Sequence, residues 1–118
     1  MLIQEVARLA GMSKDGIRHY ETMGLIGSTP RKAGSRTYRD YDPRVLPTIE
    51  QVRQAQRLGL SLAEIAPLLK TYDAATITAS DTITFLEARL VAVREKIEKL
   101  REVERFITDK IALYQRSA

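Results

Sequence analysis

Four basic side chains and two tyrosines gather within residues 27–42. They are Arg31, Lys32, Arg36, Arg39, Tyr38 and Tyr41. Guanidinium forks and phenol hydroxyls suit phosphate oxygens, so this composition favours a polyanion-binding surface. The segment is also rich in turn formers, which is typical of a solvated surface loop. We expect a basic loop or small hairpin, and its place directly after a candidate helix-turn-helix favours the polyanion hypothesis.

The net positive charge of the chain lies in its first half. The 118 residues hold 19 basic and 15 acidic side chains, a net charge of +4. Residues 1–59 hold ten basic and six acidic side chains, whereas residues 60–118 hold nine of each. Because neutralised phosphates release condensed counterions, a basic half favours a polyanion partner.

The residue inventory excludes several classes of chemistry. The chain has no Cys and a single His, His19, so it cannot build a thiolate metal site, a disulfide or a histidine cluster. No nucleophile is spaced with a base, so we predict no enzyme, no catalytic residue, no metal and no cofactor. The chain shows neither a basic leader nor 18 consecutive apolar residues, which predicts a cytoplasmic, nucleoid-associated protein with no membrane partner.

Two short helices joined by a turn are predicted near the N-terminus. Apolar residues recur at intervals of three and four over residues 3–10, and Gly11 closes that helix. Ser13 is a side-chain N-cap for a second helix over residues 14–23, and Gly24 ends it. This spacing matches a helix-turn-helix, although many helical hairpins that bind no DNA share it.

Two further helices are predicted from their start signals. Asp42 and Pro43 give an N-cap followed by Pro at the first helical position. Ser61–Glu64 is a capping box that opens the next helix. Pro47 and Pro67 lack backbone donors, so we expect an irregular first turn in one helix and a bend in the other.

The remaining residues contain a linker and a long helix. Residues 71–80 lack periodicity and are predicted to be the linker, and residues 116–118 a short tail. Between them, residues 81–115 follow a heptad repeat from Asp81 as N-cap, with Glu104 as the polar exception at its a and d positions. The predicted dimerisation residues of this seam are Leu86, Leu90, Val93, Ile97, Leu100, Ile107 and Ile111.

A helix of this length needs a partner. At ~1.5 Å per residue it spans about 50 Å, which is farther than the rest of the chain can cover. We therefore predict a coiled-coil homodimer, and the alternative is one helix folded back over its own domain. Basic side chains dominate the e and g positions, so they do not decide between parallel and antiparallel pairing.

Several motifs, in order, resemble the winged helix-turn-helix regulators of the MerR family. They are Ile3–Ala7, Gly11–Ser13, Ile17–Glu21, Gly24–Ile26, Arg36–Tyr38 and Leu58–Ile65. The resemblance covers residues 1–70 in sequence and the rest of the chain in architecture. It implies a mainly α fold, in which a winged helix-turn-helix DNA-binding domain over residues 1–70 precedes a long dimerisation helix that forms an antiparallel coiled coil.

The resemblance implies a dimeric bacterial transcription factor. Such a protein binds double-stranded promoter DNA, bends and underwinds an over-long spacer, and so realigns the promoter elements for RNA polymerase. Deforming DNA is work that many phosphate contacts on two coupled half-sites can supply.

The resemblance also implies which side chains meet DNA. The second helix would enter the major groove, and the basic hairpin would lie on the backbone as a wing. The implied contacts are Ser13, Lys14, Arg18, His19, Tyr20, Arg31, Lys32, Ser35, Arg36, Tyr38 and Arg39. Tyr20 also falls on the buried face of its helix, so a core position is its alternative. Glu21 is expected to form an ion pair within the domain.

The sequence leaves the signal open. Members of the family usually sense an effector through cysteine loops, an iron-sulfur cluster or a drug-binding domain, and these 118 residues provide none of the three. A pocket at the dimer interface, or control by protein abundance or a partner protein, would fit instead. An effector-independent architectural protein, similar to an excisionase, is the alternative function. A footprint between the two promoter elements would discriminate it from a regulator.

Overall fold

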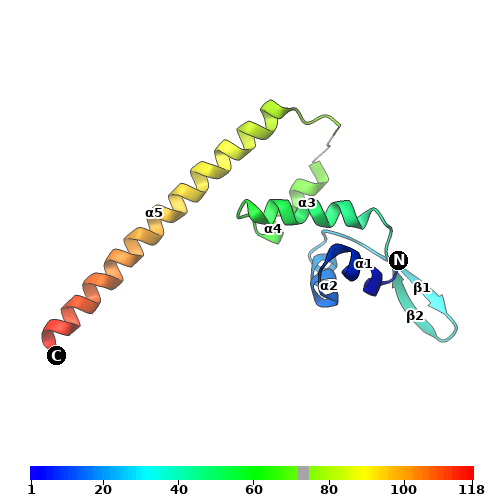
Figure 1. Ribbon diagram of the computed structural model, residues 1–118, viewed down its shortest axis with the longest axis horizontal. Coiled ribbons are helices and arrows are strands. Elements are labelled where there is room, and N and C mark those ends of the chain that lie inside the picture. Colours follow the sequence, from blue (N-terminus) through cyan, green and yellow to red (C-terminus); the bar gives the residue numbers. More distant parts are fainter. Residues whose placement is uncertain (72–74) are drawn as a thin grey trace. The chain divides into compact units, whose positions relative to one another are not determined.

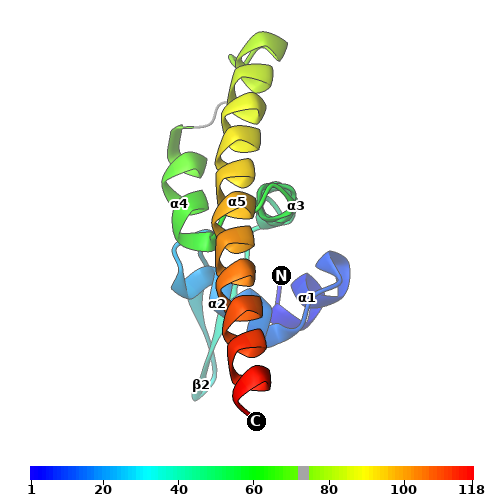
Figure 2. The same cartoon turned by 90° about the vertical axis from the view of Figure 1, so that its left-hand side faces the viewer.

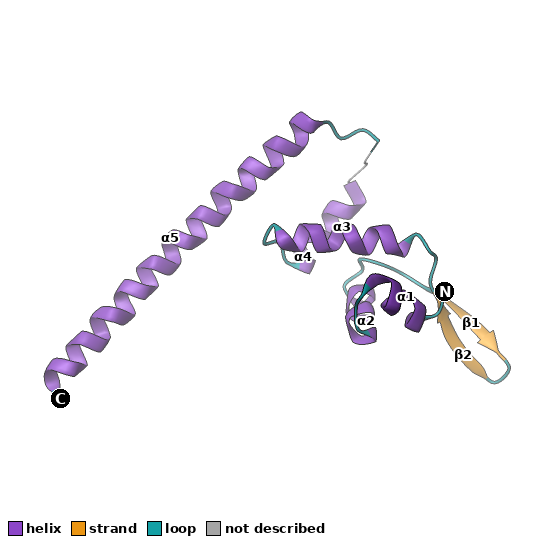
Figure 3. Cartoon of the chain, viewed as in Figure 1, coloured by secondary structure: helices purple, strands orange, loops and turns teal. Residues whose placement is uncertain are grey.

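The computed structural model describes residues 1–71 and 75–118, which divide into two compact units. The elements of the first unit are α1 (Ile3–Ala10), α2 (Lys14–Thr22), β1 (Thr29–Ala33), β2 (Arg36–Asp40), α3 (Val45–Arg57) and α4 (Leu62–Thr71). The second unit contains α5 (Ala79–Ser117). Figure 1 shows this order along the chain, and Figure 3 shows that helices dominate both units and that a two-stranded hairpin belongs to the first. The mainly α prediction is confirmed.

The predicted helix-turn-helix is present as α1 and α2. Gly11 ends α1 in the left-handed region with φ of 64°, where a glycine has no Cβ to clash. Its backbone N–H and that of Met12 close the turn onto carbonyls of α1. Ser13 then caps α2, because its Oγ accepts the backbone N–H of Gly16 at 3.0 Å.

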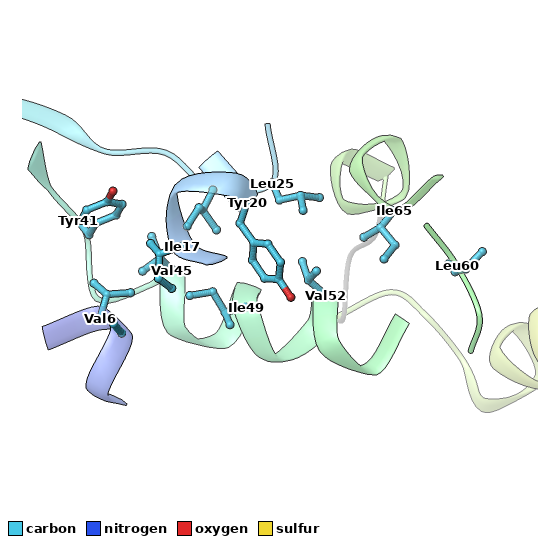
Figure 4. Close-up of a cluster of buried hydrophobic side chains, with 12 residues drawn as sticks. Val6, Ile17, Tyr20, Leu25, Tyr41, Val45, Ile49, Val52, Leu60 and Ile65 are labelled. Carbon is cyan, nitrogen blue, oxygen red and sulfur yellow. The ribbon is translucent and has the colours of Figure 1, made fainter. Parts of the chain in front are cut away.

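The core of the first unit lies where α1 and α2 pack against α3. Its buried side chains are Val6, Ala7, Ile17, Tyr20, Leu25, Ile26, Tyr41, Val45, Ile49, Val52, Leu60 and Ile65. Figure 4 shows them converging from all four helices and from the loops beside the hairpin. Each helix contributes the face that its 3.6-residue period makes apolar, so the opposite face of α2 is left toward solvent.

The starts of α3 and α4 test two predictions. The Ser61–Glu64 capping box is confirmed, since the Ser61 Oγ accepts the Glu64 N–H at 3.2 Å and a Glu64 oxygen accepts the Ser61 N–H at 3.0 Å. The prediction that Asp42 is the N-cap of α3 is wrong. Asp42 instead forms a turn with Arg44, and α3 begins at Val45. Pro47 therefore lies in the first turn, where a helix leaves backbone N–H groups unpaired and a missing donor costs little.

The second unit consists of α5 and the short segment before it. Figure 2 shows α5 running without a break for its 39 residues, about 58 Å at ~1.5 Å per residue. Thr78 is its N-cap: the Thr78 Oγ1 accepts the Asp81 N–H at 3.1 Å, and an Asp81 oxygen accepts the Thr78 N–H at 3.2 Å. The prediction of Asp81 as N-cap is therefore wrong by three positions. Residues 72–74 of the predicted linker lie outside the described residues.

Candidate nucleic-acid interface

The outward face of α2 is polar and carries positive charge. Lys14, Arg18 and His19 are exposed there, and the core takes the other side of the helix. Arg18 donates to the Asp15 carboxylate at 3.0 Å, and 60% of the Arg18 side chain remains accessible. Because an exposed ion pair contributes little, the Arg18 guanidinium can exchange Asp15 for another anion.

Gly16 lets the first turn of α2 close tightly. A Cβ on Gly16 would lie 3.1 Å from the Met12 Cε and 3.3 Å from the Ser13 Oγ. Both distances are tighter than an ordinary van der Waals contact, so a side chain here would press on the cap that starts the helix. The cost of about 1 kcal/mol that a helical Gly carries relative to Ala is therefore explained within the protein.

Tyr20 belongs to the core. Only 6% of the residue is exposed, and its hydroxyl donates to the Gln56 side-chain oxygen at 2.8 Å. Figure 4 shows its ring lying beside Ile49 and Val52 of α3. This position corrects the expectation that Tyr20 contacts DNA, because its ring and hydroxyl are both occupied in fixing α2 to α3.

The wing is an antiparallel hairpin whose basic residues divide between two faces. The register pairs Arg31 with Tyr38 and Ala33 with Arg36, whereas Lys32 pairs with Thr37 and Pro30 with Arg39. Paired residues point to the same side of a sheet and alternate along each strand. The predicted contacts Arg31, Arg36 and Tyr38 therefore share one face, and Lys32 and Arg39 share the other.

The tip of the hairpin is a two-residue turn. Gly34 has φ of 65°, and Ser35 is exposed beside it. A Gly at the first turn position is a preferred connection of tight hairpins because it accepts a positive φ. Arg31 pairs with Asp40 at 3.1 Å, and within the described residues Lys32 and Arg36 make no ion pair. Lys32 and Arg36 are therefore the cations that the wing presents without a paired carboxylate among the described residues.

Glu21 joins the end of α2 to the base of the wing. Its Oε1 accepts the Tyr41 hydroxyl at 2.8 Å, and its Oε2 accepts the Ser28 hydroxyl at 2.5 Å. The Arg39 Nη1 lies 3.6 Å from the same Oε2, which confirms the predicted ion pair within the domain. Burial, and secondly the bond to Glu21, raise the pKa of the Tyr41 hydroxyl.

A second polar cluster holds the end of β2. The Asp40 carboxylate accepts hydrogen bonds from the Met1 amino group at 2.7 Å and from the Arg31 Nε at 3.1 Å. These two bonds lower the pKa of Asp40. The hairpin is thus attached to the helices at its base by two carboxylates.

A groove of about 490 Å³ lies between α2 and the wing. It is lined by Ile3, Arg18, Glu21, Thr22, Arg39 and Tyr41. The structure therefore brings the exposed side of α2 and the basic hairpin to opposite sides of one groove. This arrangement suits a polyanion that touches both elements at once.

The roles of Ser28 and Tyr41 could not be predicted from the sequence. Both are far from Glu21 along the chain, separated from it by 7 and 20 residues, and no helical or strand period relates them. The polar character of Glu21 on a helix that packs against apolar residues was the one available signal.

The predicted seam residues of α5 are exposed or half-exposed. The exposed fraction runs from 41% at Leu86 to 67% at Leu100, and Val93 is intermediate. None of the residues of α5, all of which the structure describes, is buried. An apolar seam of this length is a second candidate surface.

The described residues form neither a candidate metal site nor a membrane-spanning helix. Residues 1–71 and 75–118 contain no group of three His, Cys, Asp or Glu side chains that could hold a metal ion. No helix in that part of the chain is long and apolar enough to span a membrane.

Comparisons with known proteins agree on one family. Residues 1–72 match the model of the MerR HTH family regulatory protein, and residues 46–109 match the model described as MerR, DNA binding. The chain is 32% identical over 107 residues to the mercuric resistance operon regulatory protein of Bacillus cereus, covering 91% of this chain and 80% of that protein. It is 29% identical over 109 residues to the HTH-type transcriptional regulator CueR of Escherichia coli O157:H7, covering 92% and 72%.

A solved structure shows the same architecture. The transcription regulator PbrR691 from Ralstonia metallidurans CH34, in complex with lead(II), superposes with a TM-score of 0.69 and 28% identity, covering 92% of this chain and 83% of that one. These relatives are transcriptional regulators and not enzymes. Given the matching family models, the helix-turn-helix and the basic wing, the chain belongs to the MerR family of DNA-binding transcriptional regulators.

Proposed function

We propose that the protein works as a homodimer on a promoter operator, where it bends and underwinds an over-long spacer and realigns the promoter elements for RNA polymerase. The observation that carries the proposal is the groove that α2 and the wing share. Lys14 and Arg18 are exposed on the helix, and Lys32 and Arg36 on the hairpin. A helix in the major groove with a basic hairpin on the adjacent backbone would use cations of both elements.

The apolar seam of α5 supports a homodimer. Burying apolar surface contributes about 25 cal/mol per Å², and a second copy of α5 would cover residues such as Leu90, Ile97 and Leu100. The antiparallel orientation of the two helices is the one that the family resemblance implies. A stiff pair of helices of about 58 Å would fix the separation of two DNA-binding units.

Rigid separation is what a DNA-bending mechanism needs. Two half-sites held at a fixed spacing make the duplex adapt to the protein, and phosphate contacts on both units supply the deformation energy. The promoter elements on either side of the operator then turn relative to one another, and RNA polymerase meets them in a productive register.

The spacer itself provides the test. In vitro transcription by RNA polymerase should be stimulated by the protein on a promoter from its own gene neighbourhood when the spacer is over-long. Shortening the spacer to the ordinary length should raise basal transcription and remove the stimulation. A footprint outside the promoter, or stimulation that is independent of spacer length, would count against the mechanism.

The same assay addresses the signal. Stimulation that requires an added cell extract would indicate a small-molecule effector bound at the dimer interface. Stimulation by the protein alone would indicate control by protein abundance or by a partner protein.

A further inference from the structure

The wing has almost no apolar attachment to the rest of its unit. Every residue of β1 is exposed, and so is every residue of β2 except Asp40, which is intermediate. Figure 1 shows the hairpin extending away from the helices, joined to them at its base. Because its strands bury no side chain against a helix, the direction in which the hairpin points must be set by contacts at its base.

One carboxylate meets both ends of the hairpin. Ser28 immediately precedes β1 and Tyr41 immediately follows β2, and the two hydroxyls donate to different oxygens of Glu21. Arg39, within β2, adds an ion pair to the same side chain at 3.6 Å and donates to the Ser28 Oγ at 3.3 Å. Tyr41 is 1% exposed, so its ring is fixed in the core and its hydroxyl is a rigid donor. Glu21 is in turn the penultimate residue of α2.

We propose that Glu21 is a positioning residue, which sets the wing at a fixed angle to α2 so that both elements can engage one duplex. This inference rests on the proposed function, because it requires that α2 and the wing bind the same DNA. Glu21 itself touches no DNA in this scheme. Both of its oxygens are occupied within the protein, and 21% of its side chain is accessible.

The sign of one mutational effect separates positioning from simple electrostatics. A carboxylate close to a DNA-binding surface repels phosphates, so its removal should strengthen binding if it has no other role. Positioning requires the opposite, because a misdirected wing loses its backbone contacts. Glu21→Ala should weaken operator binding by about tenfold. The slope of log K against log salt concentration should become less steep by the equivalent of about one phosphate contact.

Matched variants of the full-length protein complete the test, with affinity measured by fluorescence anisotropy over a salt series. Glu5→Ala, an exposed residue of α1, removes the same charge and should bind the operator as tightly as the wild type or more tightly. Glu21→Gln keeps groups that can bond to both hydroxyls and should restore affinity to within about threefold of the wild type. Tyr41→Phe keeps the buried ring, loses one of the two bonds to Glu21 and should show a smaller loss with the same reduced slope.

The salt slope distinguishes positioning from a folding defect. A partly unfolded variant has fewer active molecules but an unchanged slope, because the molecules that bind make every contact. If Glu21→Ala does not fold, Tyr41→Phe and Ser28→Ala decide the matter. Wild-type affinity and slope in these variants, or tighter binding by Glu21→Ala, would overturn the inference. Failure of the wild-type protein to bind any operator would instead overturn the proposed function.

Discussion

The Arg18 side chain is exposed, and its ion pair with Asp15 can be exchanged for a contact with another anion. Its partner Asp15 is 94% exposed, so removal of the guanidinium leaves no buried charge behind. We predict that Arg18→Ala weakens operator binding by about 1–3 kcal/mol, as loss of a phosphate or base contact does. Fluorescence anisotropy measures the affinity, and a circular dichroism melt should show an unchanged Tm. Arg57→Ala on α3 is a control of equal charge, and equal losses in the two variants would show a general charge effect.

Two aspartates of the first unit make its folded state less stable at acid pH than at neutral pH. Bonds from Arg44 lower the pKa of Asp42 from 3.8 to about 2, and bonds from the Met1 amino group and Arg31 lower the pKa of Asp40. A carboxyl whose pKa is lower in the folded state stabilises that state above its unfolded pKa, and this stability is lost as the pH falls through the folded-state pKa. For Asp42 the loss lies between about pH 4 and about pH 2.

The change Asp42→Asn tests this link. The variant should have a lower Tm than the wild type at pH 7, and its Tm should fall less steeply between about pH 4 and about pH 2. Asp109→Asn, on exposed α5, is the control and should track the wild type. Parallel Tm curves for the wild type and Asp42→Asn would contradict the role of Asp42.

Among the elements, α5 depends on its capping box for a defined start. Thr78→Ala removes the oxygen that accepts the Asp81 N–H and should cost about 1 kcal/mol, seen as lost helicity and a lower Tm by circular dichroism. Thr84→Ala makes the same chemical change inside the helix, where Ala is the better helix former. The two variants should therefore shift Tm in opposite directions. A loss of equal size in both would show that the cap contributes nothing special.

The elements that the sequence predicted well are those whose signals are local. Gly11, the Ser13 cap and the Ser61–Glu64 box each act within four residues, and each lies where it was expected. The hairpin was expected only as a loop or a small hairpin, because its register depends on pairing across the turn.

The errors share a physical cause. Asp42 and Asp81 are both of a residue type that favours helix N-caps. In the structure, however, the N-caps of α3 and α5 are Arg44 and Thr78. Periodicity put Tyr20 on the buried face of α2, yet the family pattern favoured a DNA contact, and the partner that decides between them lies 36 residues away. A contact between residues so far apart along the chain cannot be read from a short stretch of the sequence.

At the scale of the whole molecule, DNA binding and dimerisation are expected to fail together. Leu100→Glu places a charge in the centre of the α5 seam, where 67% of the side chain is exposed in the single chain. Burying an unpaired charge costs far more than the seam gains at one position. Analytical ultracentrifugation should show monomers, and operator binding should be lost. Ala88→Glu, on the outer face of the same helix, should remain dimeric and bind. A monomeric variant with full affinity would refute the coupling.

The exposed strands of the wing also make the protein a substrate for trypsin. Arg31, Lys32, Arg36 and Arg39 all stand on a hairpin that buries none of their side chains, so a protease can reach the peptide bonds that follow them in the unbound protein. A duplex lying over the hairpin would shield those bonds. The rate of cleavage between residues 31 and 40 should therefore fall as operator is added, which turns the wing into a label-free reporter of the fraction of protein that is bound.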